Sequence, residues 1–140
     1  MKKLALYSIF TLFAGFGAKA QNCEILIKDC EKILKGKEQN FVSDGQVYTA
    51  FLDREKAEFK TTFFGGTTYR IATAAGKGDK YVIFTVKDLN GNVLFTNRKF
   101  NNSNYWDFKV PGTIPVVIET ELDVNKRITG CVVMMIGFKR

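Results

Sequence analysis

The chain has 140 residues, with 21 lysines and arginines against 14 acidic residues, and it contains no histidine. The absence of histidine excludes Ser-His and Cys-His nucleophilic sites and every histidine-bound metal. The basic residues are scattered, without a block of five or more, so no nucleic-acid partner is expected.

The first 20 residues have the composition of a cleaved signal peptide. Lys2 and Lys3 precede an apolar run over residues 4–16, which is too short to span a bilayer. Ala18-Lys19-Ala20 then fits a small-residue cleavage site. We therefore expect export to the periplasm or the extracellular space, and no further transmembrane segment. Removing Lys2, Lys3 and Lys19 leaves 18 basic residues against 14 acids, a net charge of +4, for one domain over residues 21–140.

An amphipathic helix is predicted over residues 22–36. Apolar residues recur at the three- and four-residue spacing of one helical face, and charged residues take the other face. Asn22 is a suitable N-cap, and Gly36 is a suitable C-terminal stop. The apolar set consists of Cys23, Leu26, Ile27, Cys30, Ile33 and Leu34.

Three cysteines, Cys23, Cys30 and Cys131, are an odd number for an oxidising compartment. On the predicted helix, Cys23 and Cys30 lie about 10 Å apart along the axis, which exceeds the roughly 7 Å that a disulfide spans. A bridge from Cys30, or else from Cys23, to Cys131 is therefore expected if the helix forms. A local Cys23–Cys30 loop is expected if it does not. The alternative is that some or all three are buried free thiols, and a catalytic cysteine is disfavoured because no histidine activates it.

From Val47 onward the apolar period changes from that of a helix to that of strands. About eight short strands separated by turns predict a mainly β protein, an antiparallel, jelly-roll-like β-sandwich on which the helix packs. The strands are expected at residues 47–52, 57–63, 68–75, 81–88, 92–99, 105–110, 114–122 and 130–138.

Three of these segments carry further information. Asn90-Gly91 predicts a tight hairpin, because both residues accept positive φ. Pro115 stands inside a predicted strand and indicates an edge position, since proline has no N–H to donate. The strand at residues 130–138 is apolar on both faces and must be covered on both. We expect the sandwich core on one side of it and the N-terminal helix on the other.

Four motifs follow one another along the chain: Phe63-x-x-Gly66-x-x-Tyr69-x-Ile71, Val86-x-Asp88-x-Asn90-Gly91-x-Val93-Leu94, Gly112-Thr113-Ile114 and Gly130-x-Val132-x-Met134. Over roughly residues 57–138 this order resembles the bacterial pre-peptidase C-terminal domains and the related collagen-binding-type jelly rolls. It also looks like small exported proteins of unassigned function from Bacteroidetes-type bacteria, in which such a sandwich stands alone. The resemblance implies a fold more than a function. Ile114 departs from it, because that family usually carries an aromatic residue there.

The carboxylates suggest two kinds of chemistry. Asp79, Asp88 and Asn90 supply oxygen ligands of the type that calcium prefers, but their spacing is not that of an EF-hand, and the hairpin explains Asp88 and Asn90. Three acids at residues 119–123 share one strand face, and paired carboxylates can hydrolyse glycosides. A solvated strand face is the favoured interpretation. No metal and no cofactor are expected.

Aromatic residues give the remaining candidate site. Phe63 follows the alternation of its strand and is expected in the core, whereas Phe64 departs from it and is expected to be displayed beside Gly65-Gly66. Trp106 is a suspect for carbohydrate stacking, but its alternation favours the core and places Tyr105 outside. Arg70 is expected on a similar outer face, where it pairs with an acid or binds a ligand. Phe64, Arg70 and Tyr105 are thus the candidate exposed binding residues.

Three functions are compatible with these features. The first is a non-catalytic exported interaction or accessory module of the bacterial envelope, with an envelope protein or polymer as its unidentified partner. The alternative is a carrier of an apolar or lipid ligand, in a cavity enclosed by the helix and the strand with Met134 and Met135. A carboxylate-based hydrolase is the least favoured.

Overall fold

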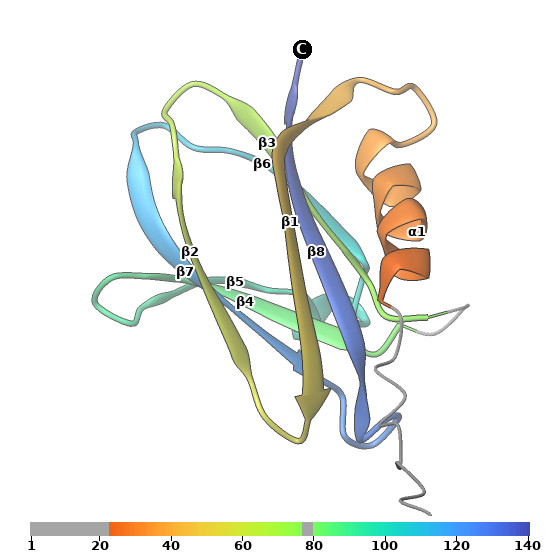
Figure 1. Ribbon diagram of the computed structural model, residues 1–140. Coiled ribbons are helices and arrows are strands. Elements are labelled where there is room, and N and C mark those ends of the chain that lie inside the picture. Colours follow the sequence, from red (N-terminus) through yellow and green to blue (C-terminus); the bar gives the residue numbers. More distant parts are fainter. Residues whose placement is uncertain (1–22, 77–79) are drawn as a thin grey trace, which may run out of the picture.

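The structure is a computed structural model, and it describes residues 23–76 and 80–140. The predicted signal peptide and Asn22 lie outside the described residues, as does Asp79. The elements are α1 (Glu24–Lys35), β1 (Phe41–Asp53), β2 (Ala57–Phe63), β3 (Thr68–Ala74), β4 (Val82–Asp88), β5 (Val93–Thr96), the 3-10 helix η1 (Asn97–Phe100), β6 (Tyr105–Lys109), β7 (Ile114–Leu122) and β8 (Thr129–Lys139), as Figure 1 shows.

The strands form two four-stranded antiparallel sheets, with the orders β1-β8-β3-β6 and β2-β7-β4-β5. Four of the strand pairs are those of one long hairpin that turns between β4 and β5. They are β1 with β8, β2 with β7, β3 with β6 and β4 with β5. Rolling that hairpin creates the two remaining pairs, β8 with β3 and β7 with β4. This is the strand order of a jelly roll, so the predicted fold class is confirmed.

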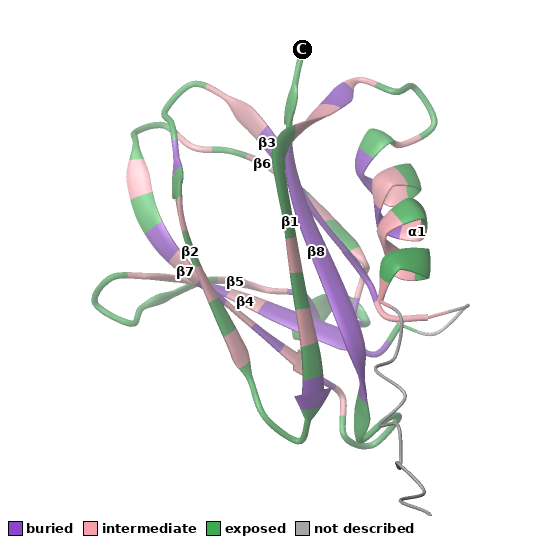
Figure 2. Ribbon diagram, in the orientation of Figure 1, coloured by how far each residue is buried: buried purple, intermediate pink, exposed green. Residues whose placement is uncertain are grey.

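The core lies between the sheets and is filled by the inward residues of the alternating strands. On β8, Met134 and Ile136 point into this core, whereas Val133 and Met135 point to the opposite face. Both faces of β8 are covered, and Figure 2 shows the strand buried along most of its length. The fully buried core side chains include Phe63, Ile71, Phe84, Val86 and Ile118.

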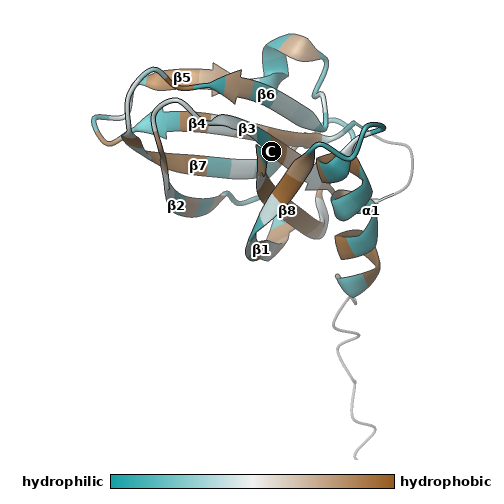
Figure 3. Cartoon of the chain, turned by 90° about the horizontal axis from the view of Figure 1, so that it is seen from above, coloured by the Kyte–Doolittle hydropathy of each residue, from teal (hydrophilic) through white to brown (hydrophobic). Residues whose placement is uncertain are grey.

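Helix α1 covers the outer face of β8 and β3, which confirms the role predicted for it. Its buried residues Cys30 and Leu34 pack on Ala72, Ala74, Val133 and Met135. Gly137 on β8 permits the close approach, because a Cβ there would lie 2.9 Å from Leu34 Cδ1 and 2.8 Å from the Val42 carbonyl oxygen. Figure 3 shows the helix against the side of this sheet, with hydrophilic and hydrophobic residues alternating along it.

Two segment boundaries differ from the prediction by more than two residues. β1 begins at Phe41 rather than at Val47, because a polar bulge between Ser43 and Val47 hides the alternation of its first residues. β5 ends at Thr96, and residues 97–100 form η1 instead of a strand. The cause is Asn97, whose buried amide accepts from the Phe84 N–H and donates to the carbonyls of Val82 and Ser103.

Two predictions of local conformation also need correction. The β4–β5 hairpin forms, but of the Asn90-Gly91 pair only Gly91 has positive φ (83°). The Gly91 N–H donates to the Asp88 carbonyl and the Asp88 N–H to the Asn92 carbonyl, so the loop has the three residues that the predicted strand ends leave for it. Pro115 lies in β7, an inner strand and not an edge. It is tolerated because β4 ends opposite Val116, so Pro115 pairs with Thr62 of β2 alone.

Candidate functional site: a basic groove at the end of the helix

A groove of about 870 Å³ lies between the C-terminal end of α1 and the outer face of its sheet. The last turn of α1 and the loop that follows it form one wall, and residues of β3, β6, β1 and β8 form the floor and the other wall. Five basic and two acidic side chains line it, which gives a net charge of +3. They are Lys32, Lys35, Lys37, Arg70 and Lys139 against Glu38 and Asp107.

Arg70 holds the floor of this groove together. It lies directly opposite Asp107 in the β3–β6 pair, and its Nε and Nη2 donate to the two Asp107 carboxylate oxygens at 2.6 and 2.7 Å. Nη1 donates to the carbonyls of Ile33 and Leu34, which are left without helical partners at the end of α1. The hydrogen bond to Asp107 raises the pKa of Arg70 above its usual value, so this side chain is always charged.

Two aromatic rings pack on the same guanidinium. Arg70 Cζ lies 4.3 Å from the Phe41 ring centroid and 4.7 Å from that of Tyr105, the geometry of cation–π contacts. Gly36 leaves space for this arrangement, because a Cβ there would lie 2.5 Å from Arg70 Nη1. The hydrogen bonds and ring contacts of the Arg70 guanidinium are thus all made to other residues of this chain. Tyr105 is held in place by Arg70 yet stays 46% exposed in the groove.

The lysines of the groove are available to a ligand. Lys32, Lys35, Lys37 and Lys139 are all exposed, and none of them forms an ion pair with a residue in the described part of the chain. The last carbonyl groups of α1 carry a partial negative charge that would offset the charge of the lysines. Arg70 already donates hydrogen bonds to two of these carbonyls and so neutralises part of that charge. The groove therefore presents a positive potential to solvent.

The structure brings together two of the three residues predicted for binding. Arg70 and Tyr105 meet in the groove, where Arg70 pairs with an acid, one of its two predicted roles. Phe64 is displayed as expected, being 61% exposed, but it lies on the β2–β3 turn and does not line the groove. The lysines were missed. The spacing of Lys32, Lys35 and Lys37 is a signal in the sequence, whereas Lys139 joins them only through the fold.

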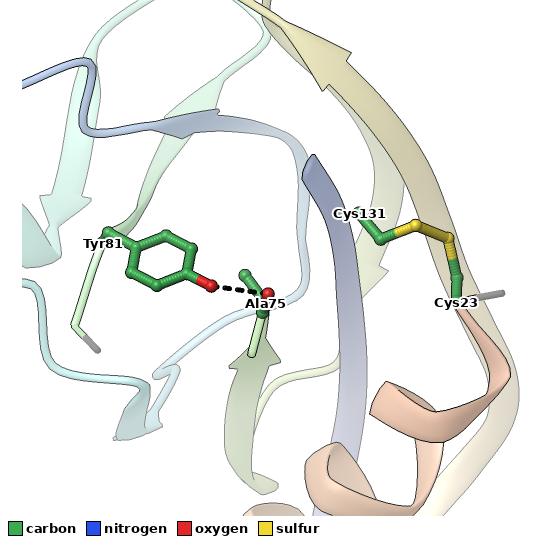
Figure 4. The surroundings of a disulfide bond; sticks show 4 residues. All are labelled: Cys23, Ala75, Tyr81 and Cys131. Carbon is green, nitrogen blue, oxygen red and sulfur yellow. Dashed lines mark hydrogen bonds between the residues drawn. A yellow bond between two sulfur atoms is a disulfide. The ribbon is translucent and has the colours of Figure 1, made fainter. Parts of the chain in front are cut away.

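The disulfide joins Cys23 to Cys131, with 5.7 Å between the Cα atoms (Figure 4). This is the second of the two predicted pairings, and the first, Cys30 with Cys131, is wrong. The reason is that α1 and β8 run in the same direction, so Cys23 lies beside Cys131 while Leu34, eleven residues further along the helix, lies against Gly137. Cys30 keeps a free thiol that donates to the Ala72 carbonyl at 3.4 Å, and burial raises its pKa to about 12.

The acids of β7 form an ion-pair network on the outer face of the second sheet. Glu119 lies 2.6 Å from Lys87 Nζ, and Lys56 bridges Glu119 and Glu121 at 3.7 and 3.3 Å. Arg98 also pairs with Glu121. The hydrogen bond from Lys87 lowers the pKa of Glu119, which is opposite to what a general acid needs. This arrangement gives the hydrolase hypothesis no support.

The calcium interpretation that the sequence disfavours and the apolar cavity of the alternative function receive no support either. The Asp88 carboxylate accepts from the N–H groups of Asn90 and Asn92 and is used by the hairpin, and no group of three potential metal ligands occurs within residues 23–76 and 80–140. Met134 and Met135 are 0% and 2% exposed, packed in the core and under α1. The depression of about 530 Å³ beside Met135 is open, with charged residues such as Glu31 and Arg140 on its walls.

Comparison with known proteins assigns no family, because no protein-family model and no curated protein matches the chain. The resemblance to pre-peptidase C-terminal domains therefore stays a prediction. Of the helices in the described ranges, none combines the length and the apolar character that a bilayer crossing requires.

Proposed function

We propose that the protein is a non-catalytic binding module, exported to the bacterial envelope, whose groove beside α1 binds an anionic polymer. The observation that carries this proposal is the set of four exposed lysines without ion-pair partners among the described residues, gathered around Tyr105. The volume of about 870 Å³ lies within the range of small-ligand sites, and the groove is open at the surface, as a polymer segment requires.

The chemistry of the groove favours repeated carboxylate or phosphate groups. Lysine ammonium groups act as compact point charges on flexible stems, which suits anionic groups spaced along a chain rather than one planar anion. Tyr105 adds an apolar ring surface of the kind that packs on sugar rings. Arg70 positions Tyr105 and the end of α1 rather than contacting the ligand.

The test is a binding titration with matched charge variants. Purified protein is titrated with polygalacturonate, with polyphosphate and with a neutral glucan at low ionic strength. The paired variant Lys35→Gln with Lys139→Gln removes two charges from the groove, and Lys60→Gln with Lys99→Gln removes two exposed charges from other parts of the surface. We expect the groove pair to weaken polyanion binding by about tenfold or more and the control pair by less than about twofold, because exposed charges act mainly over short range.

Two outcomes would contradict the proposal. Equal losses in both pairs would show that the net charge of the protein, and not the groove, attracts the polymer. Saturable binding of the neutral glucan with the same affinity as the polyanions would show that the lysines do not select the ligand.

A further inference from the structure

The outer edge of β1 is the least protected strand edge of the molecule. Within the described residues, β1, β6, β2 and β5 are the edge strands of the two sheets. Proteins protect such edges with short strands, bulges and charged side chains, because an unpaired edge can pair with another chain. β5 and β6 have only four and five residues, and β2 carries Glu58 and Lys60. β1 has 13 residues, and after its bulge it runs from Val47 to Leu52 without a charged residue.

The hydrogen bonds to β8 determine which backbone groups of β1 face away from the sheet. The Arg54 N–H donates to the Ile128 carbonyl, so the even-numbered residues in this part of β1 point their N–H and C=O groups toward β8. The odd-numbered residues point theirs to the free edge. Val47, Thr49 and Phe51 thus present unpaired donors and acceptors, and no strand of the described part of the chain pairs with them on that side.

The side chains of the same three residues lie on the outer face of the sheet, as do their partners on β8, Met135 and Val133 among them. Helix α1 covers β8 and β3 but leaves Val47 42% and Phe51 53% exposed. Thr49 between them is exposed as well, and Figure 2 shows the contrast between β1 and the buried β8. The edge therefore combines free hydrogen-bonding groups with an apolar strip, which is what an added strand needs.

The sequence of this edge is complementary to itself in one antiparallel register. When Thr49 lies opposite Thr49 of a second copy, Val47 lies opposite Phe51 and Phe51 opposite Val47. Pairs of threonines and pairs of an aromatic with a β-branched residue are both favourable across strands. A register shifted by two residues would place Asp53 opposite Val47 and lose the apolar pair.

Charged residues beyond the two ends of this segment favour the same register. Asp44 precedes it in the bulge, and Arg54 follows it in the β1–β2 turn. The register around Thr49 brings Asp44 of each copy to the same end as Arg54 of the other. Both side chains are exposed, and neither forms an ion pair with a residue that the structure describes. Two equivalent ion pairs would then flank the apolar pairs, as two-fold symmetry requires.

We propose that the protein forms a two-fold symmetric homodimer in which β1 pairs antiparallel with β1 of a second copy, with Thr49 at the axis. The pairing joins the two sheets that contain β1 into one continuous sheet and removes the free edge. It also covers Val47 and Phe51 of each copy with those of the other. The paired segment shares no residue with the polyanion groove, so the dimer is independent of the proposed function.

Sedimentation velocity of the purified protein from about 1 to 500 μM measures the oligomeric state, and a monomer–dimer equilibrium is expected in this range. Thr49→Lys places two like charges opposite each other at the axis and should raise the dimer dissociation constant by about tenfold or more. Val93→Lys is the control, because Val93 is 57% exposed on β5, the edge strand at the far side of the other sheet. It should change the constant by less than about twofold. Circular dichroism confirms that both variants fold.

Charge reversal and cross-linking test the register. Asp44→Arg should raise the dissociation constant by about threefold or more, and adding Arg54→Asp to the same chain should restore it to within about twofold. Thr49→Cys should form a disulfide-linked dimer on mild oxidation, because paired residues at the axis lie within disulfide distance, whereas Val93→Cys should not.

Three results would overturn the proposal. The first is a protein that stays monomeric over the whole concentration range, whether or not it binds other proteins. The second is an equal effect of Thr49→Lys and Val93→Lys, which would place the contact elsewhere or make it a matter of net charge. The third is a double charge reversal that fails to restore the dimer, because the register around Thr49 requires that exchange to be neutral.

Discussion

Arg70 connects three parts of the chain that are distant in sequence: the end of α1, the start of β1 and the edge strand β6. Its planar guanidinium meets the Asp107 carboxylate with two parallel hydrogen bonds while a third nitrogen reaches the helix carbonyls. A lysine offers one point charge and cannot reproduce this geometry. The residue is therefore a structural centre of the groove.

The variant Arg70→Lys should lower the free energy of unfolding by about 1–2 kcal/mol, since charge-assisted bidentate hydrogen bonds are lost from a side chain that is 13% exposed. The measurement is urea denaturation followed by circular dichroism. Arg98→Lys is the control, because Arg98 is 61% exposed, and a change of less than about 0.5 kcal/mol is expected there. Equal effects of the two substitutions would show that Arg70 has no special role.

Phe63 and Phe64 are adjacent in sequence and opposite in environment. Phe63 is buried against Tyr69 and Phe108, whereas Phe64 is exposed on the turn. Phe64→Ser should therefore change the free energy of unfolding by less than about 0.5 kcal/mol, and Phe63→Ala should lower it by about 3–5 kcal/mol. Denaturant midpoints of the two variants measure the contrast. A loss above about 1 kcal/mol for Phe64→Ser would mean that this ring is packed in solution.

At the scale of elements, the contact between α1 and β8 depends on one missing side chain. Gly137→Ala introduces a Cβ against the Val42 carbonyl oxygen, a backbone atom that cannot rotate away. We expect a loss of about 1–3 kcal/mol in the free energy of unfolding. Gly112→Ala is the matched control, because nothing lies within 4 Å of its added Cβ. Thermal melting of both variants is the measurement. A lower melting temperature for Gly137→Ala alone is expected if the helix packs tightly on the sheet, and equal melting temperatures would show that it lies loosely there.

The alternation of apolar residues was enough to predict β2, β3, β4, β6, β7 and β8, because each of these strands has one regular face toward the core. It failed where another interaction decides the conformation. The side chain of Asn97 satisfies buried backbone groups and ends β5 early, and the polar bulge after Ser43 conceals the first part of β1. The inner position of Pro115 was missed because it depends on where the neighbouring strand β4 ends, and the sequence of β7 carries no information on that.

At the scale of the molecule, one part of the candidate site could be predicted from strand periodicity, and the other part depends on how distant segments meet in the fold. Arg70 and Tyr105 were predicted on similar outer faces from strand periodicity alone, and the pairing of Arg70 with Asp107 follows from strand register. The groove could not be predicted, because Lys139 and the end of α1 meet only once the hairpin has been rolled and the helix laid on it. The choice of Cys23 over Cys30 likewise required the relative direction of α1 and β8.

The ion pairs of the second sheet make stability depend on pH. The pKa of Glu119 is lowered by Lys87, and that of Asp88 is lowered mainly by Asn92. A carboxylate with a depressed folded-state pKa stabilises the protein above its unfolded-state pKa, and this contribution is lost as the pH falls through the folded-state value. We expect the free energy of unfolding to decrease below about pH 4.

The variant Glu119→Gln isolates this contribution. Its stability should be lower than that of the unmodified protein at neutral pH, and the difference should shrink as the solution is acidified, because the glutamine does not titrate. Urea titrations from neutral to acidic pH measure the difference, with Asp53→Asn as the exposed control. A difference that stays constant with pH would show that the Glu119 charge does not contribute.

The Cys23–Cys131 bridge also determines how the molecule would bear mechanical load. A force applied between Cys23 and Arg140 passes through the disulfide directly into β8, and the loop between the two cysteines carries none of it. The disulfide prevents the 108-residue segment that it closes from being pulled out. At roughly 3.3 Å per residue, that segment would otherwise extend by about 350 Å. Only the part of β8 beyond Cys131 is under tension, and β1 and β3 hold it on both edges. A module anchored at both ends would thus keep its helix and its second sheet folded while it is pulled.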